Sequence, residues 1–246
     1  MKKFYKVCGI IGTIFFVIGG GCVIASVAMG VSFTDIYNKI LNKASNYTSY
    51  GSGNVGKKYT FETKDLDNMT IVVRSGDVTI EESSDSQIHL INYGDENTFE
   101  GNVTNRTLNI KQVSKGSVFH KIRHNSAVLQ LPKEHGFKDI LVTLGSGQID
   151  ASWLNTGLFT ADVGSGDMEV AQIKADEIDI KSGSGDVGLT VLGKEEDYNC
   201  SVIRGSGDVH LGGQDIEKGH HSSYHHKSSK SIDVKSGSGD VEIEFQ

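Results

Sequence analysis

The chain repeats one tetrapeptide, Gly-Ser-Gly-Asp, at residues 164–167, 183–186, 205–208 and 237–240. A shorter copy ends at Asp77, and a degenerate copy ends at Gln148. From the copy that ends at Gln148 onward, the spacing between the ends of successive copies is 19 residues twice, then 22 and then 32. A short unit repeated along a chain is typical of solenoids and other stacked arrays, in which each unit lies on its neighbour.

Each copy is flanked by the same apolar pattern, with a period of two residues. Apolar residues stand one and three positions after the last residue of every copy, and six and eight positions before it. The first and last of these slots hold Val78, Ile149, Met168, Val187, Val209 and Val241, and Met69, Ile140, Phe159, Ile178, Cys200 and Ile232. Mostly polar residues alternate with them, which predicts strand, corner and strand with one buried face on each strand. The sequence therefore predicts an all-β, stacked β-solenoid domain.

The corner itself is expected to be structural. Glycine reaches positive φ at little steric cost, and an aspartate carboxylate can accept hydrogen bonds from nearby backbone N–H groups. We therefore predict five turn-capping residues: Asp77, Asp167, Asp186, Asp208 and Asp240. Stacked copies place these carboxylates in a column, so a shared cation is the alternative. The calcium-binding repeat Gly-Gly-x-Gly-x-Asp differs from the motif of this chain in sequence and recurs every nine residues, so we favour turn capping over cation binding.

Residues 7–31 contain no charged side chain and exceed the roughly 20 residues that span a bilayer as a helix. Three lysines precede this run, which favours a cytoplasmic tail at residues 1–6. We predict a retained transmembrane helix at 7–31. Cleavage after Ser26-Val27-Ala28 and lipidation at Cys22 are the alternatives, and each also places the remaining chain outside the cytoplasm.

Residues 32–58 should form a short helix and a Ser-, Asn- and Gly-rich linker, and the β-repeat domain should occupy 59–246. Between the copies that end at Asp77 and Gln148 the Gly-Ser-Gly-Asp motif is absent, so this interval is expected to contain rungs with other turns. Alternating strands are predicted at 87–91 and 107–110, and Pro132 should end a third strand.

The net charge is −7, and the three N-terminal lysines leave −10 on the part after residue 31. A domain this acidic is a poor nucleic-acid binder, because such binding requires clustered Lys and Arg. Only Cys200 lies in the domain, so no internal disulfide can form there. Its position in an apolar slot predicts a buried, unreactive thiol.

The last interval contains an insertion at 219–230, which is expected to be a polar loop leaving the stack. It carries four histidines, and neutral imidazoles can bind Zn²⁺, Ni²⁺ or Cu²⁺. These low-ranked metal candidates are His220, His221, His225 and His226. No acidic residue lies among them, so we predict no metal site. The chain has no nucleophile elbow, phosphate loop or zinc-protease motif, and we predict no catalytic residue and no cofactor.

Two features together resemble a known family. Leu129-Gln130-Leu131-Pro132-Lys133 is followed by an alternating strand into a glycine corner, and a run of Ser-Gly-Ser-Gly-Asp-Val units comes after it. This pattern is similar to a bacterial β-strand-repeat family labelled "putative adhesin", a domain of unknown function related to auto-transporter adhesin head domains. The resemblance covers about 59–246 and implies a solenoid-like domain, often behind a membrane anchor in Gram-positive bacteria.

We therefore expect a single-pass membrane protein whose domain faces outward and binds an envelope protein or glycan, without enzymatic activity. The alternative is a scaffold or regulatory partner of membrane proteins in an envelope-stress system. It draws on a stripe of small residues in the predicted span, namely Cys22, Ser26 and Gly30. A solenoid enzyme such as a polysaccharide lyase would need convergent acids and bases, which the exposed slots do not show.

Overall fold

A computed structural model describes residues 55–93, 98–113, 126–216 and 221–246. The predicted cytoplasmic tail, the predicted transmembrane helix and most of the 32–58 segment lie outside the described residues. Within the described ranges, no helix is long and apolar enough to cross a bilayer. Residues 53–246 form one compact unit, whose first strand begins at Val55, slightly before the predicted domain start.

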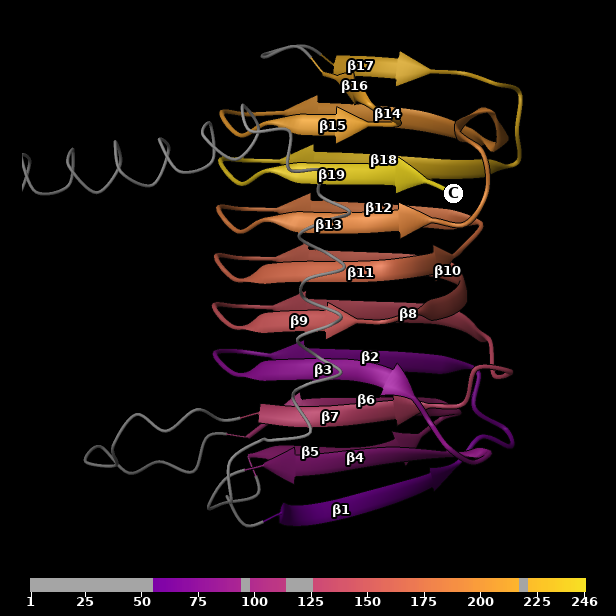
Figure 1. Cartoon of the computed structure of the whole chain (residues 1–246), viewed down its shortest axis with the longest axis vertical. Coiled ribbons are helices and arrows are strands. Elements are labelled where there is room, and N and C mark those ends of the chain that lie inside the picture. The colour runs from indigo at the N-terminus through magenta and orange to yellow at the C-terminus, as the bar shows by residue number, and fades with distance from the viewer. Residues whose placement is uncertain (1–54, 94–97, 114–125, 217–220) are drawn as a thin grey trace, which may run out of the picture. The chain divides into compact units, whose positions relative to one another are not determined.

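The domain is a stack of rungs, each made of two strands joined by a corner (Figure 1). Six rungs have described corners: β2(Asn68–Val73)–β3(Asp77–Glu82), β8(Phe137–Leu144)–β9(Gln148–Ala151), β10(Leu154–Val163)–β11(Asp167–Lys174), β12(Glu177–Ser182)–β13(Val187–Val191), β14(Tyr198–Arg204)–β15(Val209–Leu211) and β18(Lys230–Ser236)–β19(Val241–Phe245). The strand before each corner lies in one sheet, here called sheet 1, and the strand after it lies in sheet 2. Neighbouring rungs pair in parallel and in register, which confirms the all-β, solenoid-like prediction.

The apolar slots form one continuous core between the two sheets. Every residue assigned to the four slots is buried, from Met69 and Val78 in the first rung to Val241 and Ile243 in the last. The pattern in β12 is a strict alternation of exposed and buried residues, as the period of two requires. Aliphatic layers lie directly above one another, so each rung completes the core of the next.

The corner glycines are required for a reason different from the predicted one. In the described chain the glycines with positive φ are Gly193, Gly212 and Gly213, and none of them belongs to a corner. Instead, a Cβ on the second glycine of a corner would lie 1.7–2.2 Å from the carbonyl oxygen of the equivalent glycine in the adjacent rung. Close stacking of backbone on backbone therefore excludes any side chain there.

The sequence led us to expect rungs that stack in chain order, but the structure shows a different order. β18 pairs with β12 on one side and with β14 on the other, and β19 likewise lies between β13 and β15. Cys200 therefore neighbours Ile232 and not Ile178, which occupies the equivalent slot one copy earlier in the chain. The connection 192–197, which contains the short 3-10 helix η1(Glu195–Asp197), spans the inserted rung. Adjacent rungs need only the two-residue connections 152–153 and 175–176.

A second rung is placed out of chain order near the other end of the stack. β6(Thr107–Gln112) and β7(Ser126–Leu131) pair with β2 and β3, so the interval between Asp77 and Gln148 does contain a further rung. That rung lies beyond the first rung instead of between the first and second. β7 ends immediately before Pro132, as predicted. The connection 132–136 then passes the β2–β3 rung to reach β8.

Antiparallel strands close both ends. β4(Gln87–Tyr93) joins β7 to β1(Val55–Glu62), and β5(Phe99–Thr104) is the partner of β6. At the opposite end β16(Gln214–Asp215) pairs with β15, and β17(His221–Tyr224) pairs with β14. The prediction that 219–230 is a loop leaving the stack is therefore wrong for residues 221–224, which extend sheet 1 by one strand.

Candidate functional site

The corner aspartates form a hydrogen-bonded ladder along one edge of the stack. Asp167 accepts from the backbone N–H of Asp186 at 3.1 Å, and Asp186 accepts from that of Asp240 at 2.8 Å. Asp240 in turn accepts from the N–H of Asp208 at 2.7 Å. Burial raises the pKa of Asp186, and the neighbouring Asp240 and Asp167 carboxylates add to the shift. The ladder couples each corner to the next, which is a register-setting role.

Asp77 occupies the same column at the other end of the repeat, beside Gln148. Gln148 breaks the row of carboxylates, and its amide donates to Asp150 at 3.0 Å. Among the described residues, no group of three or more His, Cys, Asp or Glu side chains is placed to hold a metal ion. Three of the five corner aspartates, Asp167, Asp186 and Asp240, accept a backbone N–H from the adjacent rung, and Asp208 accepts from Arg204.

The slot four residues before the corner aspartate is polar in three rungs. The Ser182 hydroxyl donates to the Gly185 carbonyl, and the Ser236 hydroxyl donates to the Gly239 carbonyl. In the β14–β15 rung the slot holds Arg204, which is buried. Its guanidinium donates to the carbonyls of Gly207 and Ile216 and to Asp208. Ile216 is buried at this end of the core, so Arg204 stabilises the corner of the last repeat rung in the stack.

Sheet 2 carries a row of acids on its outer face, including Asp150, Glu169 and Glu242. The Glu169 carboxylate lies over Gly188, where a Cβ would be 2.1 Å from its Oε2. Burial raises the pKa of Glu169 to about 7, with further contributions from Asp150, Glu242 and Glu244. The pKa of Glu242 is also raised by burial and by Glu244. Such a row is costly when ionised, because like charges are held side by side.

This row makes stability depend on pH. Because the folded-state pKa of Glu169 lies above its ordinary value of 4.5, the protonated form favours the fold. Stability should fall as the pH rises from about 4.5 through about 7. Glu169→Gln should therefore raise the free energy of unfolding by about 1–2 kcal/mol at pH 8, after allowance for solvent screening, and by little at pH 4.

Urea unfolding at both pH values measures this effect. The matched control is Glu177→Gln, since Glu177 is exposed on the opposite sheet. Equal effects of the two substitutions at pH 8 would contradict the assignment.

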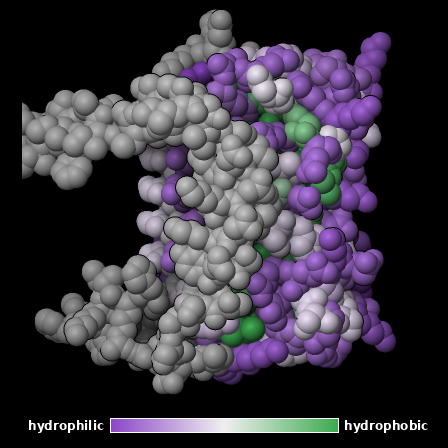
Figure 2. All heavy atoms as spheres, viewed as in Figure 1, coloured by the Kyte–Doolittle hydropathy of each residue, from purple (hydrophilic) through white to green (hydrophobic). Residues whose placement is uncertain are grey.

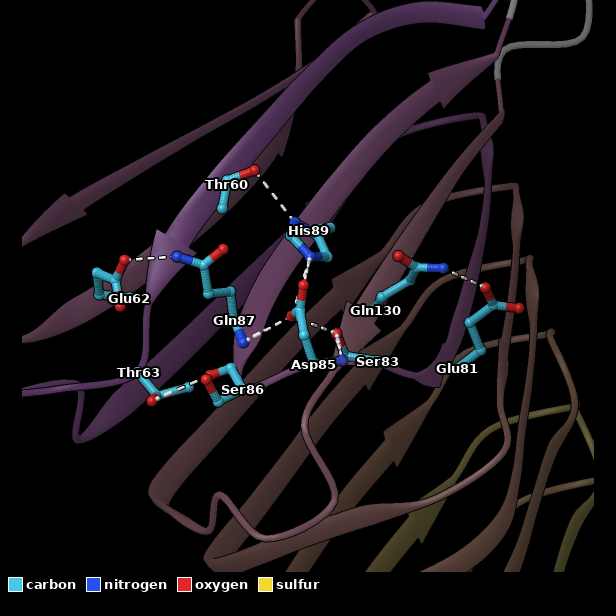
Figure 3. Close-up of polar contacts among 10 residues, drawn as sticks. All are labelled: Thr60, Glu62, Thr63, Glu81, Ser83, Asp85, Ser86, Gln87, His89 and Gln130. Atoms are coloured by element: carbon cyan, nitrogen blue, oxygen red, sulfur yellow. Dashed lines mark hydrogen bonds and ion pairs between the residues drawn. The ribbon is translucent and has the colours of Figure 1, made fainter.

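A buried histidine network ties the edge strand β1 to the β3–β4 connection (Figure 3). His89 Nε2 lies 3.0 Å from Asp85 Oδ2, and His89 Nδ1 lies 3.1 Å from Thr60 Oγ1. The Gln87 backbone N–H donates to Asp85, and this bond, followed by that of His89, holds the pKa of Asp85 below its ordinary value. Both ring nitrogens of His89 have a hydrogen-bond partner, so the network links β1 to the β3–β4 connection. Sequence analysis did not predict this network, because His89 stands in a polar position of an ordinary alternating strand.

A shallow groove of about 440 Å³ opens between β1 and β5. Phe61, Leu66 and Val103 provide its apolar lining, and the Val103 side chain is 48% exposed. Arg106 on its rim donates to Asp67 at 2.6 Å, and this bond lowers the pKa of Asp67 to about 2. On the face seen in Figure 2, the described surface is mainly hydrophilic with small, separated hydrophobic areas.

Of the histidine candidates that the structure describes, none belongs to a group of three or more His, Cys, Asp or Glu side chains that could hold a metal ion. His221 lies in β17 opposite Ile203, and the side chains of His225 and His226 are exposed in the connection to β18. The His226 backbone N–H donates to Asn199. His220 lies outside the described residues.

Cys200 is buried in β14, and burial raises the pKa of its thiol to about 11, followed by the effects of Glu195 and Asp233. In a chain with Cys8 and Cys22 replaced by serine, we expect thiol labelling at pH 8 to be at least about a hundredfold slower than for an exposed cysteine. The matched control is Ile203→Cys combined with Cys200→Ser, because Ile203 is 47% exposed on the same strand. Similar labelling rates at the two positions would show that the end rung is open.

The rungs, glycine corners and aspartate ladder define a β-solenoid-like repeat domain. The family model Toastrack DUF4097 matches residues 66–246, and the chain belongs to this family. Among curated proteins, the comparison finds no match.

Solved structures with a similar fold include a "putative cell adhesion protein" from Clostridium sporogenes ATCC 15579. It is 18% identical, with a TM-score of 0.51, and the match covers 77% of this chain and 99% of that one. A "putative adhesin" from Bacteroides fragilis NCTC 9343 is 14% identical, with a TM-score of 0.40 and coverage of 76% and 96%. Another from Parabacteroides merdae ATCC 43184 is 15% identical, with a TM-score of 0.37 and coverage of 78% and 97%. At these identities the likeness concerns the fold.

Proposed function

We propose that the chain is a membrane-anchored module that holds its β-repeat domain outside the cytoplasm and binds a protein or glycan of the cell envelope without catalysis. The uncharged run at 7–31 and the lysines before it support the anchor and its orientation. The name of the Clostridium sporogenes structure, a "putative cell adhesion protein", agrees with a binding role.

The observation that carries the proposal is the outer face of sheet 1. Asp179 stands directly beside Asp233, and Lys181 directly beside Lys235, in parallel register. The side chains of Asp179, Lys181 and Lys235 are exposed, and that of Asp233 is half-buried. Adjacent strands lie about 4.8 Å apart, so the face presents a pair of acids next to a pair of lysines at short spacing. Such a flat, rigid, charged surface suits a ligand with repeated polar groups.

A binding assay on purified cell envelopes tests this proposal. The domain should bind on its own, and Asp179→Ser combined with Asp233→Ser should weaken binding by about tenfold, the effect of losing about 1.4 kcal/mol. The control is Glu82→Ser combined with Glu134→Ser, which removes two exposed acids outside sheet 1. Absence of binding, or an equal loss in the control, would overturn the proposal.

The alternative, a regulatory partner of membrane proteins, is favoured by the small residues Cys22, Ser26 and Gly30 in the predicted span. Replacing 7–31 with an unrelated span separates the two functions. An envelope-binding module keeps its activity as long as export survives, whereas a partner that acts through its helix loses it.

A further inference from the structure

The rung β18–β19 fills a slot between two rungs that precede it in the chain. On one side, residues 231–236 pair in register with 177–182, and 241–245 pair with 187–191. On the other side, residues 230–236 pair with 198–204, and 241–243 pair with 209–211. Both walls of the slot therefore belong to parts of the chain that precede this segment.

The slot recognises its occupant through backbone, corner and core together. The Asp240 N–H donates to Asp186, and Asp240 accepts from the Asp208 N–H. Ile232, Val234, Val241 and Ile243 enter the shared core. At the far end the Gln246 N–H donates to the Val191 carbonyl at 2.9 Å. Another copy of the same segment would satisfy every one of these contacts equally well.

The connection that delivers the segment is short and strained. It runs from the end of β17 at Tyr224 to the start of β18 at Lys230. Within it Lys227 has φ of 56°, in the left-handed region that costs a residue with a Cβ about 1 kcal/mol. Strained short hinges favour domain swapping, because the strain is released when the segment extends to another molecule.

We propose that the slot between β12–β13 and β14–β15 is a strand-exchange site, which accepts residues 230–246 of a second copy of this chain in place of its own. Two copies then hold each other by reciprocal exchange of one rung. No new contact is needed, since the exchanged rung makes the same contacts in either molecule. This inference is independent of the envelope-binding proposal.

Cross-linking between two differently marked full-length chains tests the exchange. One chain carries Asp179→Cys and the other Asp233→Cys, both with Cys8 and Cys22 replaced by serine. These two positions face each other across β12 and β18, so a disulfide between chains requires that the rung of one chain lies in the slot of the other. After mixing at high concentration and oxidation, we expect a covalent heterodimer whose amount rises with concentration.

A matched mixture of Asp162→Cys and Asp233→Cys controls for contact between the outer faces. Asp162 lies on the same face, but its neighbour across the ladder is Lys181 of β12, one rung short of the exchanged strand. This mixture should give little heterodimer. Equal cross-linking in the two mixtures, or none in the first, would overturn the proposal.

A second variant tests the hinge. Lys227→Gly removes the strain at positive φ and should lower the heterodimer fraction about fivefold, the factor that corresponds to the strain at one residue. The control is Ser229→Ala, which changes an exposed residue of the same connection and should leave the heterodimer fraction unchanged. An unchanged heterodimer fraction in Lys227→Gly would contradict the role given to the hinge.

Discussion

Gly185→Ala is expected to lower the free energy of unfolding by about 3 kcal/mol or more. Gly185 is the second glycine of a central corner, and a Cβ there would lie 1.8 Å from the Gly166 carbonyl oxygen. Both atoms belong to the backbone or are fixed directly to it, so the rungs would have to separate to relieve the clash. That separation would also stretch the aspartate ladder and open the core beneath it.

Urea unfolding followed by circular dichroism measures the loss. Ser184→Ala is the matched control, since Ser184 is exposed in the same corner and should change stability by less than about 0.5 kcal/mol. A loss below about 1 kcal/mol for Gly185→Ala would mean that the rungs are not stacked at this distance.

Arg204→Ala is expected to lower stability by about 2–4 kcal/mol, mainly by freeing the end rung. The substitution leaves the Gly207 and Ile216 carbonyls without their donor in a buried setting, and Asp208 loses its cation. The end rung should then open more often than the rest of the stack. Cys200, on the same strand, reports this opening as faster thiol labelling.

Arg204→Ser is the informative comparison, because serine occupies the same slot in two other rungs and bonds to the corner carbonyl there. It should lose less stability than Arg204→Ala, since it can still donate to Gly207. Equal losses for the two substitutions, or unchanged Cys200 labelling in both, would show that the guanidinium does not hold the end of the stack.

The glycine corners show how a correct prediction can have the wrong reason. The sequence indicated that these positions must be glycine, and the structure agrees, but their φ values are ordinary. The requirement comes from the neighbouring rung, which approaches too closely for a Cβ. A contact of this kind is visible only once two rungs are placed together.

Sequence analysis missed the strand in the histidine insertion and the His89 network, because both depend on contacts between segments that are distant in the chain. Polar residues at 221–224 carry no alternating apolar pattern, yet they form β17 because β14 would otherwise be an edge strand. His89 reaches Thr60 only because β4 pairs with β1, which places the two residues opposite each other.

The sequence by itself determined the rung, its corner and the residues that enter the core, because the period of two and the repeated Gly-Ser-Gly-Asp specify local structure. Only the tertiary structure decided the order of the rungs. Ile178, Cys200 and Ile232 occupy equivalent slots, so local pairing energies do not distinguish one neighbour from another. The order is set by features outside the repeat: the longer connection 192–197 and the charged Arg204. That arginine requires an end position, where Ile216 can reach its guanidinium.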